Sequence, residues 1–311
     1  MKLRIALLAL LVAGCAAPAL SPSVEPSVEP TPSSSLSLPI QTQEPSPVPI
    51  PVDEAMFARR FTVLIAGADT SRSRRASGLD DWNTDALMVV SVSADKSRIA
   101  VLSLPRDTVD LPMPDGSTYR GKVNGIAQKF GMETLRGAMS KLIGAPIDRF
   151  IRVDMDDFAW MVDAVGGVDV EVKSRIADSQ VHLFLDPGPA HFDGATALAF
   201  SRTRADSDYG RAARQQQVVL ALVARWLDPG AGALVGSIRL LGSLQTDIGL
   251  NELTTLLAIG RASASAPVTA IVLKPTRFSL FVGFEPNSTR GWVMIPNLSE
   301  IRAYAKSVLS D

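Results

Sequence analysis

The chain has 311 residues, of which 46% are hydrophobic, with 31 Lys and Arg against 32 Asp and Glu. This apolar content is enough for a sizeable core, which excludes a wholly disordered protein. The near balance of charge excludes an overall basic field that would attract nucleic acid. One cysteine and two histidines exclude a disulfide framework and a zinc cluster of thiolates. Any anion-binding site must therefore be local.

The first 14 residues predict an export signal. Lys2 and Arg4 precede an apolar run that is too short to span a bilayer, and small residues follow at 12–14. Together with Cys15 they resemble a bacterial lipoprotein box, which implies that Cys15 becomes the acylated N-terminus and anchors the protein to a membrane. An ordinary signal peptide with an accidental cysteine is the alternative.

Residues 15–59 predict a lipid-anchored tether. They are rich in Pro, Ser, Glu and Val, as in SVEPSVEPTPSSS. Such a segment cannot bury enough apolar surface to offset the entropy lost on ordering. We therefore expect a disordered Pro/Ser-rich tether, followed by one folded domain over residues 60–311.

Apolar strands and amphipathic helices alternate along the predicted domain. Their spacing predicts strands at 61–69, 86–94, 98–105, 150–153, 168–172 and 268–274. Helices are predicted at 158–165, 211–227 and 250–262, and after Pro296. This order indicates an α/β fold in which helices cover both faces of a sheet.

A dense cationic segment, SRTRADSDYGRAARQQQ, occupies residues 201–217. If a helix begins at Arg211, then Arg211 and Arg214 lie in its first turn and face the positive end of the helix dipole, at a cost of a few tenths of a kcal/mol each. A bound phosphate would offset this cost. Neutralisation by Asp206 and Asp208 on a solvated surface is the alternative.

Arg202 and Arg204 favour the phosphate interpretation. ATALAFSRTR predicts a short helix that runs into a strand, on which these two alternate residues share a face. Two like charges on one face repel each other. With Arg211 and Arg214 they would suit a ligand that carries two or more negative charges, such as pyrophosphate.

Further charged residues stand at the ends of predicted strands. Asp69 follows the first strand and Asp85 precedes the second, so their carboxylates could approach each other and hold Mg²⁺ with substrate phosphates. Arg106 and Asp107 follow the third strand, at the edge where open α/β sheets bind ligands. Lys122 is either a further phosphate contact or a solvated side chain. For each isolated aspartate, a turn or capping role is the alternative.

Several stretches, in order, resemble the motifs of the LytR-CpsA-Psr family of bacterial cell-wall enzymes: TDALMVVSVSADKSRIAVLSLPRDT, KVNGIAQKFG, IDRFIRVDMDDFAWMVDAVGGVDVEV and GATALAFSRTRADSDYGRAARQQQ. The resemblance implies a three-layer α/β/α fold around a central mixed sheet. It also implies a phosphotransferase that moves an anionic glycopolymer from an undecaprenyl-pyrophosphate carrier to peptidoglycan with Mg²⁺. Polyprenyl pyrophosphatase activity is a further implication.

The resemblance also implies residue roles. It assigns Mg²⁺ to Asp69 and Asp85, and a catalytic role to Asp85, Arg106, Arg202 and Arg204. The pyrophosphate contacts that we expect, with Lys122 added from the sequence, are Arg106, Lys122, Arg202, Arg204, Asp208, Arg211, Arg214 and Gln215. The prenyl tail would need an apolar tunnel, for which Phe, Met, Leu and Val residues of 147–185 are candidate linings; an ordinary core role for each is the alternative.

The chain departs from the family pattern near the predicted metal site. Many members carry Arg where this chain has Asn83, and Ala86 replaces a motif Thr. A non-catalytic polyprenyl-phosphate-binding carrier or sensor lipoprotein is therefore the alternative. The balanced charge, the export signal and the lack of a helix-turn-helix pattern disfavour a DNA-binding regulator. The expected location is extracytoplasmic, lipid-anchored at the outer face of the cytoplasmic membrane.

Overall fold

The computed structural model describes residues 51–79, 81–227 and 244–310. The export signal, Cys15 and most of the predicted tether lie outside these residues. Residues 51–59, predicted as tether, include the helix α1 (Glu54–Ala58), whose Met56 is buried in a cluster with Ile259. The backbone N–H of Asp53 donates to Thr255 Oγ1 at 2.8 Å. Ordered, packed structure therefore begins before residue 60.

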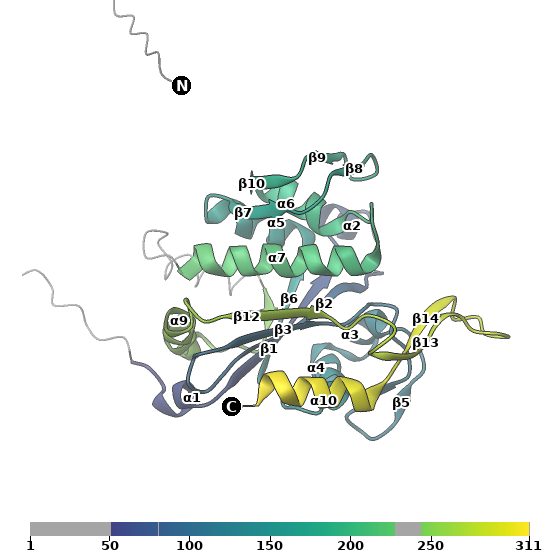
Figure 1. The fold of residues 1–311 in the computed structure, drawn as a ribbon, viewed down its shortest axis with the longest axis horizontal. Coiled ribbons are helices and arrows are strands. Elements are labelled where there is room, and N and C mark those ends of the chain that lie inside the picture. The colour runs from purple at the N-terminus through teal and green to yellow at the C-terminus, as the bar shows by residue number, and fades with distance from the viewer. Residues whose placement is uncertain (1–50, 80, 228–243, 311) are drawn as a thin grey trace, which may run out of the picture. The chain divides into compact units, whose positions relative to one another are not determined.

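A six-stranded sheet lies at the centre of the folded part (Figure 1). Its order is β11 (Gln245–Thr246), β6 (Arg149–Asp154), β1 (Phe61–Ala68), β2 (Thr84–Val92), β3 (Ile99–Ser103) and β12 (Val268–Val272). The strand β1 runs antiparallel to β2 and parallel to β6, so the sheet is mixed, as expected.

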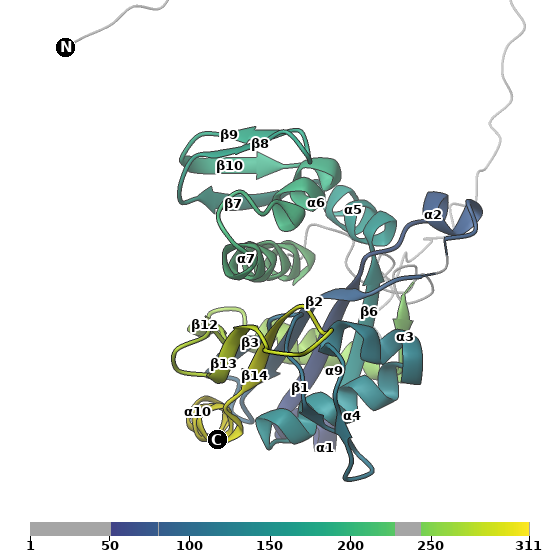
Figure 2. The same cartoon turned by 90° about the vertical axis from the view of Figure 1, so that its right-hand side faces the viewer.

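Helices cover both faces of the sheet (Figures 1 and 2). The helices α3 (Ile126–Phe130), α4 (Met132–Ile143) and α10 (Leu298–Leu309) pack on one face, where Leu64 and Ala66 enter the main core. The helices α5 (Met155–Ala164), α6 (Gly194–Arg202) and α7 (Asp208–Leu227) lie on the other. Because side chains alternate along a strand, Ile65 and Gly67 face this second layer. The predicted α/β/α architecture is confirmed.

The strand predicted at 168–172 forms outside the central sheet. It is β7 (Val168–Val172), and it pairs antiparallel with β10 (Gly188–Phe192) in a separate two-stranded sheet. It cannot join β6, because β1 and β11 occupy both edges of that strand. A second apolar core joins β7 and β10 to α5, α6 and α7.

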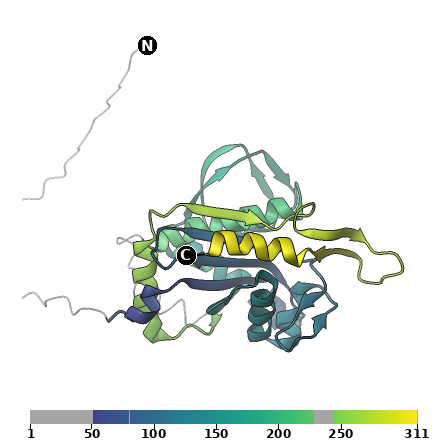
Figure 3. The same cartoon turned by 60° about the horizontal axis from the view of Figure 1, so that its bottom comes forward.

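A C-terminal hairpin that the sequence did not predict consists of β13 (Ser279–Phe284) and β14 (Trp292–Pro296). It projects beyond the sheet in Figure 3. The N–H of Met294 donates to the Asp107 carbonyl at 3.0 Å, and the N–H of Val109 donates to the Met294 carbonyl at 3.0 Å. The hairpin is thus bonded to the segment that follows β3. Among the described residues, no helix combines the length and apolarity needed to cross a bilayer.

The close packing of α6 on α5 can be tested at Gly194. Its N–H donates to Asp163 Oδ1 at 2.7 Å, and a Cβ there would lie 2.1 Å from the Ala159 carbonyl oxygen of α5. We expect Gly194→Ala to lower the free energy of unfolding by about 1–3 kcal/mol, because the helices must separate. Urea denaturation measures the change. Gly125→Ala is the control, since its Cβ would meet only Tyr119 Oη at 3.5 Å and should change stability by less than about 1 kcal/mol. Equal stability of both variants would contradict this packing.

Candidate functional site

A large apolar cavity lies between the sheet and the helices α5, α6 and α7. Its volume is about 530 Å³, within the range of ligand pockets. Ile65 and Met88 line it from the sheet, and Leu222 and Trp226 line it from α7. The expected stretch 147–185 contributes Ile151, Val153, Met155, Phe158, Met161 and Val181. The structure therefore contains an apolar cavity where the sequence predicted a tunnel.

Charged side chains line one part of the same cavity. They include Asp69, Asp85, Arg202, Arg204 and Arg211, together with the neutral Gln215, and Asp154 and Asp178 also line the cavity. Arg202 Nη2 lies 4.0 Å from Asp69 Oδ1, and Arg204 Nη2 lies 3.8 Å from Asp85 Oδ2. The cavity thus joins a long apolar volume to a compact group of charges.

A β-bulge directs Asp85 into this group. Gly67 pairs with Ala86, but Ala68 pairs with Thr84, so Asp85 is the extra residue on β2. Bulges often redirect a side chain beside an active site. Oδ2 of Asp85 accepts a hydrogen bond from Arg106 Nη1, whereas the buried Oδ1 has no hydrogen-bond partner. This carboxylate therefore has an acceptor available for a ligand.

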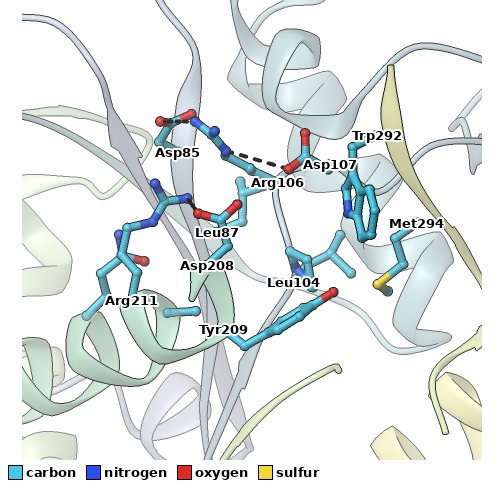
Figure 4. Close-up of a pocket in the computed structure, with 13 residues that line it drawn as sticks. Asp85, Leu87, Leu104, Arg106, Asp107, Asp208, Tyr209, Arg211, Trp292 and Met294 are labelled. Carbon is cyan, nitrogen blue, oxygen red and sulfur yellow. Dashed lines mark hydrogen bonds and ion pairs between the residues drawn. The ribbon is translucent and has the colours of Figure 1, made fainter. Parts of the chain in front are cut away.

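A second, smaller cavity, of about 210 Å³ and drawn in Figure 4, shares lining residues with the first. The two share Asp85, Arg211 and Gln215. The smaller cavity is also lined by Leu87, Leu104, Pro105, Arg106, Asp107, Asp208, Tyr209, Ala212, Trp292 and Met294. Figure 4 shows Arg106 between Asp85 and Asp107, and Arg211 against Asp208. The shared residues therefore face two separate volumes.

Arg211 is the most buried cation of the group, with 7% of its side chain exposed. Its Nη2 lies 3.3 Å from Asp208 Oδ1, and its buried Nε has no hydrogen-bond partner. Burial lowers the pKa of Arg211; Asp208 opposes this shift, while the charges of Arg106 and Arg204 add to it. A bound anion would offset both the desolvation and the repulsion between guanidinium groups.

Arg202 and Arg204 do not share a strand, so that prediction is wrong. Arg202 ends α6, and Arg204 lies in the following loop. Thr203 explains the difference: its Oγ1 donates to Asp178 Oδ2 at 2.5 Å and accepts from the Ala205 N–H at 3.3 Å. These side-chain hydrogen bonds stabilise a loop conformation, so the segment does not pair as a strand. Both arginines nevertheless line the large cavity.

Arg214 lies apart from the other arginines. The helix α7 begins at Asp208, three residues before the predicted start, so Arg214 falls in its second turn. Its Nε donates to the Phe200 carbonyl at 3.1 Å, and its two Nη atoms donate to the Thr203 carbonyl and to Asp206. It lines neither cavity. The structure therefore places Arg214 against the end of α6 and the loop that carries Arg204, apart from the arginines that line the cavities.

Lys122 also lies outside both cavities and contacts a residue that lines one of them. Its Nζ donates to Asp107 Oδ1 at 2.6 Å. The alternative interpretation, in which aspartates neutralise the arginines, agrees in part with the structure. Asp206 pairs with Arg214, and Asp208 pairs with both Arg204 and Arg211. The sequence interpretation missed Tyr209 and Trp292, although Tyr209 adjoins the predicted Asp208.

Comparisons with known proteins show which family this chain resembles. The model of the LytR_cpsA_psr family matches residues 36–282. Polyisoprenyl-teichoic acid--peptidoglycan teichoic acid transferase TagV of Bacillus subtilis is 27% identical over 264 residues, covering 79% of this chain and 64% of TagV. The TagU transferase of Bacillus mycoides, similarly named, is 31% identical over 198 residues, covering 63% of this chain and 60% of TagU. The matched region thus spans less than two thirds of these relatives.

A solved structure supports the fold. The crystal structure of B. subtilis TagV superimposes with a TM-score of 0.66 at 24% identity, covering 81% of this chain and 98% of that one.

The structural role of Arg214 predicts a stability difference between two arginines. Arg214→Met would leave the buried Phe200 and Thr203 carbonyls without their donor, and should lower the free energy of unfolding by about 2–3 kcal/mol. Arg202→Met should change it by less than about 0.5 kcal/mol, because half of that side chain is exposed. Chemical denaturation measures both. A larger loss for Arg202→Met would overturn the assignment.

Proposed function

This chain belongs to the LytR-CpsA-Psr family, and we propose that it transfers an anionic glycopolymer from a polyprenyl-diphosphate carrier to peptidoglycan. The relatives TagV and TagU are named as transferases of teichoic acid from a polyisoprenyl carrier to peptidoglycan. The geometry of the site supports this transfer chemistry, whichever glycopolymer is transferred.

One observation carries the proposal: guanidinium groups gather where a large apolar cavity meets a charged one. A prenyl diphosphate is an amphiphile with the same two parts. Its isoprenoid tail would gain from burial against Phe158, Met161 and Leu222. Its diphosphate would accept hydrogen bonds from Arg106, Arg204 and Arg211, because guanidinium forks match phosphate oxygens.

The arginines would stabilise charge during phosphoryl transfer, which requires positioning and electrostatic stabilisation more than covalent chemistry. An acceptor hydroxyl would form a bond to the phosphorus that carries the glycopolymer. The bond from that phosphorus to the bridging oxygen would break, and prenyl monophosphate would leave with the electron pair. The hydroxyl proton would pass to a carboxylate, for which Asp85 is the candidate since it lines both cavities.

The residues present fit Mg²⁺ bound together with substrate. Asp69 and Asp85 line the same cavity, and Asp85 Oδ1 is an unpartnered buried acceptor. In the part of the chain that the structure describes, no group of three or more potential ligands exists. Mg²⁺ is commonly held by one or two carboxylates plus substrate phosphates. When bound, it would neutralise charge on the diphosphate.

The lipid anchor is part of the same proposal. From the sequence around Cys15, we propose that acylation holds the protein at the outer face of the cytoplasmic membrane, near a lipid-linked substrate. Any polyprenyl pyrophosphatase activity would use the same site, with water as the acceptor.

Asn83 favours a second candidate, a carrier or sensor that binds polyprenyl phosphates without turnover. Its carbonyl accepts the Asp69 N–H at 2.8 Å, so it lies beside the proposed metal ligand. Its carboxamide brings no positive charge to a position where the family resemblance implies Arg in many members.

Removal of one site arginine tests the proposal. Arg204→Ala should reduce glycopolymer transfer to peptidoglycan by about 100-fold or more, because a charge at the reacting phosphates is lost. Radiolabelled polymer attached to peptidoglycan gives the rate. The matched control is Arg175→Ala, since Arg175 is 79% exposed and pairs only loosely with Asp186. A folded Arg204→Ala protein with full activity would refute the role of Arg204.

Mg²⁺ dependence separates the enzyme from the carrier. The whole protein is incubated with a short prenyl diphosphate, with and without Mg²⁺, and released phosphate is measured. The enzyme should release phosphate with Mg²⁺, and both chelation and Asp85→Asn should reduce the rate by about tenfold or more. Tight binding without phosphate release, and without transfer to peptidoglycan, would favour the carrier.

A further inference from the structure

Two aromatic rings lie at the surface of the β13–β14 hairpin. Phe284 is 73% exposed and Trp292 is 47% exposed. Their rings meet edge to face, with centroids 5.6 Å apart and an interplanar angle of 82°. Exposed adjacent aromatic rings contribute little to the core and commonly mark a binding surface.

The hairpin connects these rings to the charged site. Trp292 and Met294 alternate on β14, so they share a face, and both line the smaller cavity (Figure 4). The N–H of Met294 donates to the carbonyl of Asp107, the residue that follows Arg106. This bond holds β14 beside the segment that carries Arg106, and Trp292 lines the same cavity as that arginine.

We propose that the smaller cavity, with Trp292 and Phe284 at its rim, binds the sugar rings of the acceptor glycan. This inference rests on the proposed function. The C–H face of a pyranose is apolar and flat, and so packs well on an indole, while its hydroxyl groups need hydrogen-bond partners. Asp107, Tyr209 and Gln215 supply polar groups in the same cavity.

Tyr209 is suited to a sugar hydroxyl. Burial, followed by the negative charges of Asp208 and Asp107, raises the pKa of Tyr209. The phenol therefore stays neutral at physiological pH and can both donate and accept a hydrogen bond.

The two cavities give separate approaches to one reaction centre. They share Asp85, Arg211 and Gln215, so a diphosphate at the charged part of the large cavity and a sugar in the smaller one would reach the same residues. In-line displacement needs the attacking and leaving oxygens on opposite sides of the phosphorus. Two cavities that share lining residues let the acceptor and the diphosphate approach the phosphorus from different sides, which a single cavity does less well.

A glycan fits the surface better than a lipid bilayer does. Trp292 lines the same cavity as Arg106 and Asp107, whose polar groups can bond sugar hydroxyls. The loop between the two strands carries Glu285 and Arg290, which pair with each other, and this charged pair is costly to insert among acyl chains.

Direct binding of a soluble glycan tests the inference. The probe is a β-1,4-linked tetramer of N-acetylglucosamine, titrated into the whole protein by calorimetry. Trp292→Ala should weaken binding by about tenfold or more. The control Leu280→Ala removes another exposed apolar side chain of the hairpin, 72% exposed and outside both cavities, and should change binding by less than about twofold.

A parallel titration with a short prenyl diphosphate separates the two proposals. Trp292 does not line the large cavity, so Trp292→Ala should bind this lipid within about twofold of the unaltered protein. If the unaltered protein binds the tetramer through Trp292 but not the diphosphate, the glycan site stands and the proposed function fails. No binding of the tetramer, equal binding by Trp292→Ala, or Trp292-dependent binding to anionic lipid vesicles alone would overturn the glycan site.

Discussion

The site depends on holding guanidinium groups close together against their mutual repulsion. Arg106, Arg204 and Arg211 surround Asp85 and Asp208, and the pKa of Arg211 is lowered by burial and by its cationic neighbours. Ion pairs in a partly buried site offset this repulsion only in part. A bound anionic ligand would offset the remaining repulsion between the guanidinium groups. The apolar cavity beside these charges would hold the hydrophobic group of the amphiphilic anion that we propose.

The fold brings these charges together from three distant segments. A bulge on β2 directs Asp85 out of the regular alternation, and the segment after β3 supplies Arg106. The loop between α6 and α7 supplies Arg204, and Arg214 holds that loop through backbone carbonyls. The C-terminal hairpin is bonded to the second of these segments through Asp107. One scaffold thus positions the charges and the aromatic rim.

Much of this arrangement could be predicted from the sequence, because it follows from local patterns. Apolar runs predicted the central strands, and the clustered arginines predicted an anion site. The strand across Arg202 and Arg204 was wrong because the hydroxyl of Thr203 competes for the backbone, a tertiary effect that alternation does not reveal. Sequence spacing alone could not show that Arg214 and Arg211 have different partners, because the acceptors of Arg214 lie on α6 and in the loop that follows α6. Trp292 was missed because its strand reaches the site through a bond between Met294 and Asp107, which lie nearly 190 residues apart in the chain.

We propose that the clustered arginines bind a diphosphate whose tail occupies the apolar cavity. A crystal structure of the protein with a bound prenyl diphosphate would test this binding mode. We expect phosphate oxygens within hydrogen-bond distance of Arg106, Arg204 and Arg211, with the tail against Phe158 and Leu222. A diphosphate bound elsewhere, with these arginines still paired only to Asp85, Asp107 and Asp208, would contradict it.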